Sequence, residues 1–116
     1  MAAVALNKFL TIRHKATADY VGIYTCPTGV ASVVLTCQAT NVSTGAGAST
    51  YNISGIHSRT DGGFNFAYEF DIPENDGSNL LGDGKLALET SDILMFKSNV
   101  ADKIDIILSV LETAKS

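Results

Sequence analysis

The 116-residue sequence has no tryptophan, two prolines, two cysteines and no run of basic residues. Two cysteines are too few for the disulfide framework of a small secreted domain. The missing basic run and the net charge of −4 argue against a nucleic-acid partner. No apolar run approaches the ~20 residues of a membrane-spanning helix, and no basic-then-apolar signal sequence begins the chain. These absences predict a protein made in the cytosol, without a nucleic-acid or membrane partner.

Charge is also scarce, at 17% of residues against a usual ~25%, while hydrophobic residues reach 46%. A chain of this length forms one domain, here residues 1–116, with a real but modest core. Either that core is unusually complete, or part of the surface is covered by a partner.

Alternating residues are the main secondary-structure signal. In residues 103–112, Ile and Leu alternate with Lys, Asp and Ser until Ile107 interrupts the pattern, as in a half-buried β-strand. Residues 64–72 alternate most clearly, with an aromatic residue or Ile at every even position. We therefore expect a core that contains Phe66, Phe70, Leu86, Leu88, Ile104, Ile106 and Leu108.

Turn residues divide the chain into about eight such segments. Pro27-Thr28-Gly29 and Asp61-Gly62-Gly63 separate strand candidates, and residues 30–42 form the longest strand, with Val33, Leu35, Cys37 and Ala39 facing inward. Residues 4–13 fit a strand, although a helix competes there. The prediction is an all-β fold, an antiparallel β-sandwich of about eight strands that is jelly-roll-like, with a small barrel as the other arrangement.

No residue pattern supports catalysis. His14 and His57 are isolated, and Glu69 and Asp71 read as ordinary outward charges rather than a glycosidase pair. The acidic loop around Glu74 and Asp83 could offer oxygens to calcium, but turn formation explains these residues more simply. We predict no enzyme activity, no metal and no cofactor.

The two cysteines, Cys26 and Cys37, lie on segments that we expect to be adjacent. Cys37 belongs to an apolar alternation and reads as a buried thiol. A Cys26–Cys37 disulfide is the alternative.

Several apolar residues fall on strand faces that alternation predicts to be exposed to solvent. Ile107 and Leu111 point away from the inner face of their strand, and Leu94 and Phe96 oppose Ile93 and Met95 on another. Monomers rarely expose a contiguous apolar patch, so we predict an interface at Leu94, Phe96, Ile107 and Leu111. The alternative is that a helix or loop covers this second face, but the sequence offers no good helix.

Four segments carry a resemblance to a known family. They are Tyr24-Thr25-Cys26-Pro27-Thr28-Gly29, residues 39–43 (ATNVS), residues 86–94 (LALETSDIL) and residues 104–112 (IDIILSVLE). Their order resembles small all-β virion structural proteins of tailed bacteriophages, including cyanophages. Ser91 and Thr28 stand where this family usually has Gly and Ala.

The resemblance implies a non-enzymatic accessory subunit of a virion, made in the host bacterial cytoplasm, where its cysteines stay reduced. Such a subunit decorates the capsid or belongs to the neck or tail, forms a homo-oligomer such as a trimer, and binds other virion proteins. One alternative is a carbohydrate-binding β-sandwich that aids adsorption, against which the lack of tryptophan argues. The other is a small jelly-roll enzyme, which normally needs a His/Glu metal cluster.

Overall fold

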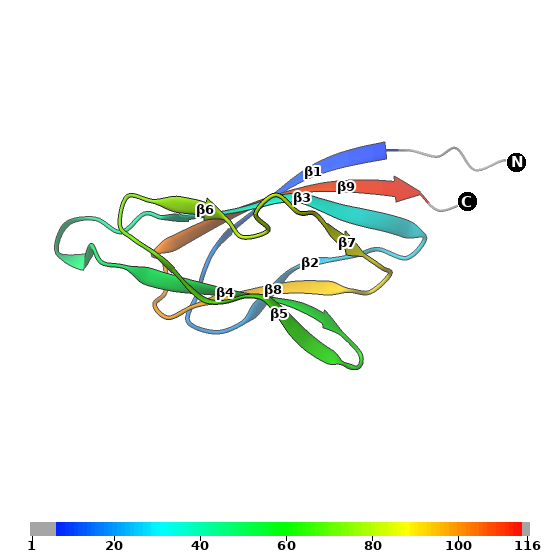
Figure 1. Ribbon diagram of the computed structural model, residues 1–116. Coiled ribbons are helices and arrows are strands. Elements are labelled where there is room, and N and C mark those ends of the chain that lie inside the picture. The colour runs from blue at the N-terminus through cyan, green and yellow to red at the C-terminus, as the bar shows by residue number, and fades with distance from the viewer. Residues whose placement is uncertain (1–6, 115–116) are drawn as a thin grey trace, which may run out of the picture.

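The computed structural model describes residues 7–114 as two antiparallel sheets packed face to face, as Figure 1 shows. The strands are β1 (Asn7–Lys15), β2 (Val21–Thr25), β3 (Val30–Asn41), β4 (Tyr51–Arg59), β5 (Gly62–Ile72), β6 (Gly77–Asn79), β7 (Leu86–Leu88), β8 (Ile93–Ser98) and β9 (Ile104–Ala114). A 3-10 turn, Gly45–Gly47, is the only helical element in the described part of the chain.

One sheet, here sheet A, has the order β1-β9-β3-β6, and β7 also pairs with β3. The other, sheet B, has the order β2-β8-β4-β5. This interleaving of early and late strands is the order of a jelly roll. The predicted β-sandwich is therefore confirmed, with nine strands rather than about eight, and the competing helix in residues 4–13 is wrong because β1 occupies residues 7–15.

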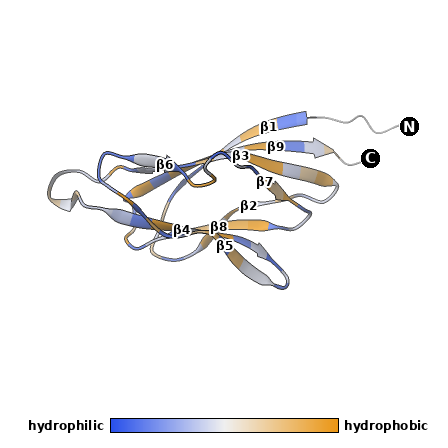
Figure 2. Ribbon diagram, viewed as in Figure 1, coloured by the Kyte–Doolittle hydropathy of each residue, from blue (hydrophilic) through white to orange (hydrophobic). Residues whose placement is uncertain are grey.

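Strand β9 holds the centre of sheet A, and its inner side chains are fully buried. Ile104, Ile106, Leu108 and Val110 are all at most 1% exposed, as their alternation predicts. In Figure 2 the hydrophobic segments of β3 and β8 lie in opposite layers of the sandwich. The buried apolar side chains that form this core are Ala16, Tyr24, Cys26, Val34, Cys37, Ala39, Ile53, Ile72, Leu88, Leu94, Phe96, Ile104, Ile106, Leu108 and Val110.

The predicted inner face of β3 is correct only in its second half. The register with β9 shifts between Val34 and Thr36, so one extra residue, Leu35, is inserted there. This bulge reverses the side-chain alternation. Val34, predicted to face outward, is therefore buried, while Cys37 and Ala39 are buried as expected.

The predicted burial of two β5 aromatics is wrong for Phe70 and holds in part for Phe66. Phe70 is 44% exposed, Phe64 and Tyr68 are each 70% exposed, and Phe66 is half-buried. Strand β5 is the edge of sheet B, its pairing with β4 shifts register twice, and the β4–β5 hairpin projects away from the other sheet (Figure 1). Alternation marks which side a residue faces, but an edge strand has little opposite it to bury the side chain.

Phe66 still reaches the core through a glycine. Its ring packs edge-on against Phe96, with centroids 5.6 Å apart. It lies over Gly55, where a Cβ atom would sit only 2.5 Å from the Phe66 ring. The absence of a side chain at Gly55 thus leaves the space that the Phe66 ring occupies. Of the other predicted core residues, Leu88 is buried and Leu86 is half-buried.

Candidate functional site

The predicted interface residues do not form one stripe. Leu94 and Phe96 are 1% and 0% exposed, so their predicted outward position is wrong. Their strand, β8, lies in sheet B, whereas Ile107 and Leu111 lie on β9 in sheet A. Strand β8 does have two apolar faces, but its inner one is Leu94 and Phe96, and its outer one is Ile93 and Met95, which are half-buried.

Leu111 instead belongs to an apolar row across the outer face of sheet A. It pairs with Phe9 on β1 and with Val33 on β3, and Val33 pairs with Ala87 on β7. Phe9 is 72% exposed, Ala87 is exposed, and Leu111 and Val33 are half-buried. We call Phe9, Leu111, Val33 and Ala87 the outer row.

Ile107 lies on the same face but has polar neighbours. It is 44% exposed and pairs with Arg13 on one side and Gln38 on the other. Between Ile107 and the outer row, Ser109 pairs with Thr11 and Thr36. On the other side of the outer row, Thr113 pairs with Asn7 and donates to its Oδ1 at 3.1 Å. The outer row is therefore an apolar band between polar pairs.

Phe9 is an apolar residue on the outward face of β1. Phe9 and Lys8 interrupt the predicted pattern of residues 4–13. In the structure Leu10 and Ile12 face the core, so their neighbour Phe9 must face outward. Alternation over residues 4–13 also places Val4 and Leu6 on the inner side with Leu10 and Ile12, but Val4 and Leu6 lie outside the described residues.

Asp92 is the centre of the main charged cluster. It is 2% exposed and follows a turn between β7 and β8. Its Oδ1 accepts from Arg59 Nε at 2.7 Å, and its Oδ2 lies 2.8 Å from both His57 Nε2 and the backbone N of Glu89. Burial by itself raises the pKa of the Asp92 carboxyl, but the hydrogen bonds from Arg59, Glu89 and His57 outweigh it and hold this pKa well below its usual range.

This cluster includes a His–Asp pair, but the carboxylate is saturated by other partners. Arg59 also donates to Glu89 Oε2 at 2.7 Å, which ties β4 to the β7–β8 turn. The small hollow beside it, about 180 Å³, is lined by Arg59, Thr60 and residues 89–92. The arrangement is that of a structural ion-pair network.

A second polar cluster is buried where β2, β3 and β9 meet. The Tyr24 hydroxyl donates to Glu112 Oε2 at 2.5 Å and lies 2.7 Å from Ser32 Oγ. Burial and the Glu112 hydrogen bond raise the pKa of the Tyr24 phenol. These bonds join the two sheets and satisfy polar groups inside the sandwich.

Both cysteines are free and buried, at 1% exposure each. Cys26 Sγ lies 3.3 Å from Ser32 Oγ, whereas burial raises the pKa of the Cys37 thiol to about 12. Cys26 directly follows β2 of sheet B, whereas Cys37 lies on β3 of sheet A, so the two segments are not adjacent strands as expected. The structure has two free thiols and not the alternative disulfide.

Within residues 7–114, no group of three or more His, Cys, Asp and Glu is arranged to hold a metal ion. In the acidic loop, the Asp76 carboxylate accepts from the Gly77 backbone, as in a turn. No helix in this described range is long and apolar enough to span a membrane.

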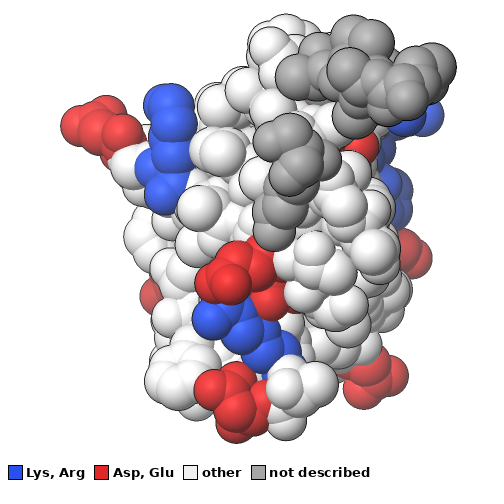
Figure 3. Space-filling model, turned by 90° about the vertical axis from the view of Figure 1, so that its right-hand side faces the viewer, with Lys and Arg blue, Asp and Glu red and all other residues white. Residues whose placement is uncertain are grey.

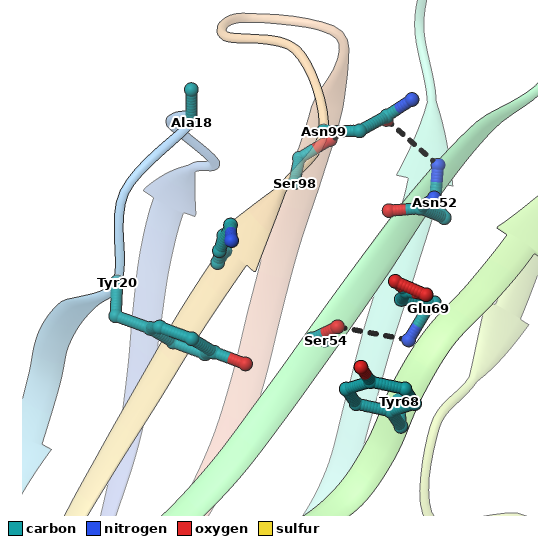
Figure 4. A pocket seen from close by; sticks show the side chains of 9 residues that line it. Ala18, Tyr20, Asn52, Ser54, Tyr68, Glu69, Ser98 and Asn99 are labelled. Carbon is teal, nitrogen blue, oxygen red and sulfur yellow. Dashed lines mark hydrogen bonds between the residues drawn. The ribbon is translucent and has the colours of Figure 1, made fainter.

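A polar hollow of about 390 Å³ lies over the outer face of sheet B (Figure 4). Tyr20, just before β2, and Tyr68, on β5, stand on its two sides, and Ser54 on β4 lies between them. Sequence reasoning missed this site because its residues come from four segments that only the sheet brings together. The positions of Tyr20 and Tyr68 carry no local motif.

The charges elsewhere are scattered. On the face shown in Figure 3, acidic and basic side chains occur in small mixed groups among uncharged residues. That face therefore offers no single-sign patch for an extended charged partner.

The sequence matches no protein-family model and no curated protein. The structure is similar to a chain of the acidic-stable capsid structure of Helicobacter pylori bacteriophage KHP30, with a TM-score of 0.60 and 12% identity over 97% of this chain and 94% of that one. It is also similar to a chain of the Bacillus endospore appendages, described as disulfide-linked pili, with a TM-score of 0.55 and 12% identity over 97% and 89%. At this identity the likenesses establish a shared β-sandwich fold.

Proposed function

We propose that this chain is a non-enzymatic accessory subunit of a tailed-phage virion, which self-associates and docks on other virion proteins. Capsid decoration and the neck or tail are the positions that the sequence resemblance allows. The subunit is made in the host bacterial cytoplasm and ends in the virion. The observation that carries the proposal is the outer row, an apolar group that crosses sheet A from β1 to β7.

The outer row can supply useful association energy. Burying a few hundred Å² of apolar surface contributes several kcal/mol at ~25 cal/mol/Å², before the entropy of association is subtracted. In a symmetric ring or on a repeating lattice, several copies contribute at once, and the second contact forms at high effective concentration. A modest patch on each subunit is then sufficient.

The sheet edges favour association through the face. The β1 edge carries Lys8, Arg13 and Lys15, and charged residues oppose edge-to-edge pairing. The β5 edge is distorted where its pairing with β4 shifts register. Both features are ways in which soluble β-proteins avoid uncontrolled strand addition.

The fold similarity supports an assembly role, since one similar chain belongs to a phage capsid and the other to a pilus. The pili are described as disulfide-linked. In this chain both cysteines are buried. We therefore propose that its subunits associate without covalent links.

The test is a pair of matched variants. Phe9→Ser combined with Leu111→Ser should leave the fold intact and lower the mass measured by light scattering, and should weaken co-sedimentation with phage particles. Phe64→Ser is the control, because Phe64 is 70% exposed, close to the 72% of Phe9, but lies on sheet B. Ile107→Asp tests whether the interface extends along β9.

Circular dichroism and thermal melting establish that each variant is folded. If the folded double variant assembles and co-sediments like wild type, the outer row is not the interface. If Phe64→Ser disrupts assembly instead, the contact lies on sheet B.

A further inference from the structure

The hollow on sheet B is built by side chains that face one another across three strands. In Figure 4 the rings of Tyr20 and Tyr68 extend toward the space above Ser54, with Glu69, Asn52 and Asn99 along one end. At about 390 Å³, it falls within the usual ~300–1,000 Å³ of small-ligand sites. It is distinct from the outer row, which lies on sheet A.

The backbone places Glu69 here by an unusual conformation. Glu69 has φ of 46°, in the left-handed region that residues other than glycine rarely adopt. It sits where β5 shifts register against β4, and its backbone N donates to Ser54 Oγ at 2.8 Å. Ser54 is itself 4% exposed, so the bulge is held by a buried hydroxyl. Backbone strain of this kind is retained where the surrounding structure determines it, often at a binding site.

Several polar groups of the hollow are left available for a ligand, and others are held in place by protein contacts. Asn99 Oδ1 accepts from the Asn52 backbone N at 3.0 Å, which fixes Asn99 and leaves its NH2 group to donate elsewhere. Lys97 Nζ already has an aromatic partner, because it lies over the Tyr20 ring, 5.5 Å from its centre. Among the described residues, the carboxylate of Glu69, the phenol groups of Tyr20 and Tyr68 and the side-chain amide of Asn52 make no hydrogen bond to the protein.

We propose that this hollow binds an uncharged, hydroxyl-rich saccharide. Sugar rings present C–H faces that pack on aromatic rings and hydroxyl pairs that bond to planar carboxylate and amide groups, and the hollow offers both. Two tyrosines supply the aromatic surfaces that tryptophan often provides, each with a hydroxyl at its tip. The donor and acceptor groups of Asn52, Asn99, Lys97 and Glu69 match hydroxyls, which both donate and accept.

Other ligand classes fit less well. A phosphate or other anion would meet Lys97 but also the Glu69 carboxylate, whose charge opposes it. An extended peptide needs a free sheet edge or an apolar groove, whereas this hollow is mostly polar and lies on a sheet face. The proposal does not depend on the virion assignment.

The experiment is binding of the full chain to an immobilised array of neutral and acidic oligosaccharides, followed by calorimetric titration of the best-binding glycan. Wild type should bind a neutral glycan. Tyr68→Ala should weaken that binding up to about tenfold through the loss of one ring contact. Phe64→Ala is the matched control and should change little, because Phe64 is on the same strand and equally exposed but does not line the hollow.

Two variants at Glu69 separate ligand contact from fold. Glu69→Gly removes the carboxylate and relieves the positive φ, so it should bind more weakly while its melting temperature stays the same or rises. Glu69→Gln keeps the shape and should also bind more weakly.

The proposal is overturned if wild type binds no glycan on the array, if it prefers acidic glycans, or if Tyr68→Ala and the Glu69 variants bind like wild type. Light scattering of the same variants should be unchanged. A negative result for saccharide binding therefore does not bear on the proposed interface at the outer row. A negative result for that interface does not bear on saccharide binding.

Discussion

Arg59 binds both carboxylate oxygens of Asp92, with Nε donating to Oδ1 at 2.7 Å and a terminal nitrogen donating to Oδ2 at 3.1 Å. Arg59 ends β4, and Asp92 directly precedes β8, two neighbouring strands of sheet B. The pair therefore fixes the β7–β8 turn, where the chain crosses from sheet A to sheet B. Its planar, two-point geometry is the strong form of this ion pair.

Asp92→Asn should destabilise the fold at neutral pH and should flatten its acid sensitivity. Charged hydrogen bonds contribute ~1.5–3 kcal/mol, so a loss of about 2–3 kcal/mol is expected. Because the folded-state pKa of Asp92 is lowered, its stabilisation is complete above the unfolded pKa of ~3.9 and is lost as pH falls from there. Urea unfolding followed by circular dichroism from pH 2 to 7 should show the two proteins converging in acid.

Glu89→Gln is the matched control for Asp92→Asn, because the Glu89 side chain is 73% exposed and bonds to the same arginine. It should change stability by a few tenths of a kcal/mol, as exposed ion pairs do. An acid profile of Asp92→Asn that parallels wild type would show that another carboxyl governs acid unfolding.

Cys37→Ser should destabilise the protein by about 1–3 kcal/mol, because it buries a hydroxyl in an apolar row. Cys26→Ser should be milder, since Ser32 Oγ and the Val30 carbonyl lie within reach of the Cys26 sulfur. Chemical denaturation of the two variants measures the difference. Equal losses would mean that a serine at position 37 finds a partner.

Reductant should leave the melting temperature unchanged, because both thiols are free. Native protein should also react slowly with a thiol reagent at both positions until it unfolds. A large fall in melting temperature on reduction would instead reveal a disulfide.

Ile106→Ala should cost on the order of 2–5 kcal/mol, through lost burial and the cavity that remains. Phe70→Ala should cost about 1 kcal/mol or less, because a side chain that is 44% exposed loses only part of a full burial term. Equilibrium unfolding compares them directly. A larger loss at Phe70 would mean that β5 is covered in solution.

Ser91→Gly should stabilise the protein by up to about 1 kcal/mol, because Ser91 has φ of 74° and glycine adopts this conformation without strain. The neighbouring Thr90→Gly, without a positive φ, should destabilise it. Thermal melting distinguishes the two, and a loss at Ser91→Gly would show that its side chain stabilises the turn.

The sequence predicts burial best in β9, which lies in the middle of sheet A with sheet B opposite. In β9, Ile104 and Ile106 are buried by both neighbouring strands and the facing sheet, so alternation suffices. In β3 the same reasoning failed at Val34, because the bulge at Leu35 has no sequence signal as clear as glycine. In β5 it failed at Phe70, because edge position depends on long-range pairing.

The candidate sites were less predictable than the fold. Leu111 was identified as outward-facing, but its row-mates Phe9 and Val33 become neighbours only through the β1-β9-β3 order. Leu94 was wrongly predicted to face outward, because the sequence of a strand with two apolar faces does not indicate which face is buried. The hollow between Tyr20 and Tyr68 depends on a register shift at Glu69, which local patterns do not encode.

The central place of β9 in sheet A determines the order in which the strands can pair during synthesis. Strand β1 pairs with β9 from Asn7 to Lys15, and β3 pairs with it along nearly its whole length. These two pairings can form only after residues 104–114 have been made, and pairing over such sequence distances is slow. Until then β1 has no sheet partner and β3 has only the short strands β6 and β7, so the main part of sheet A forms late, when β9 appears.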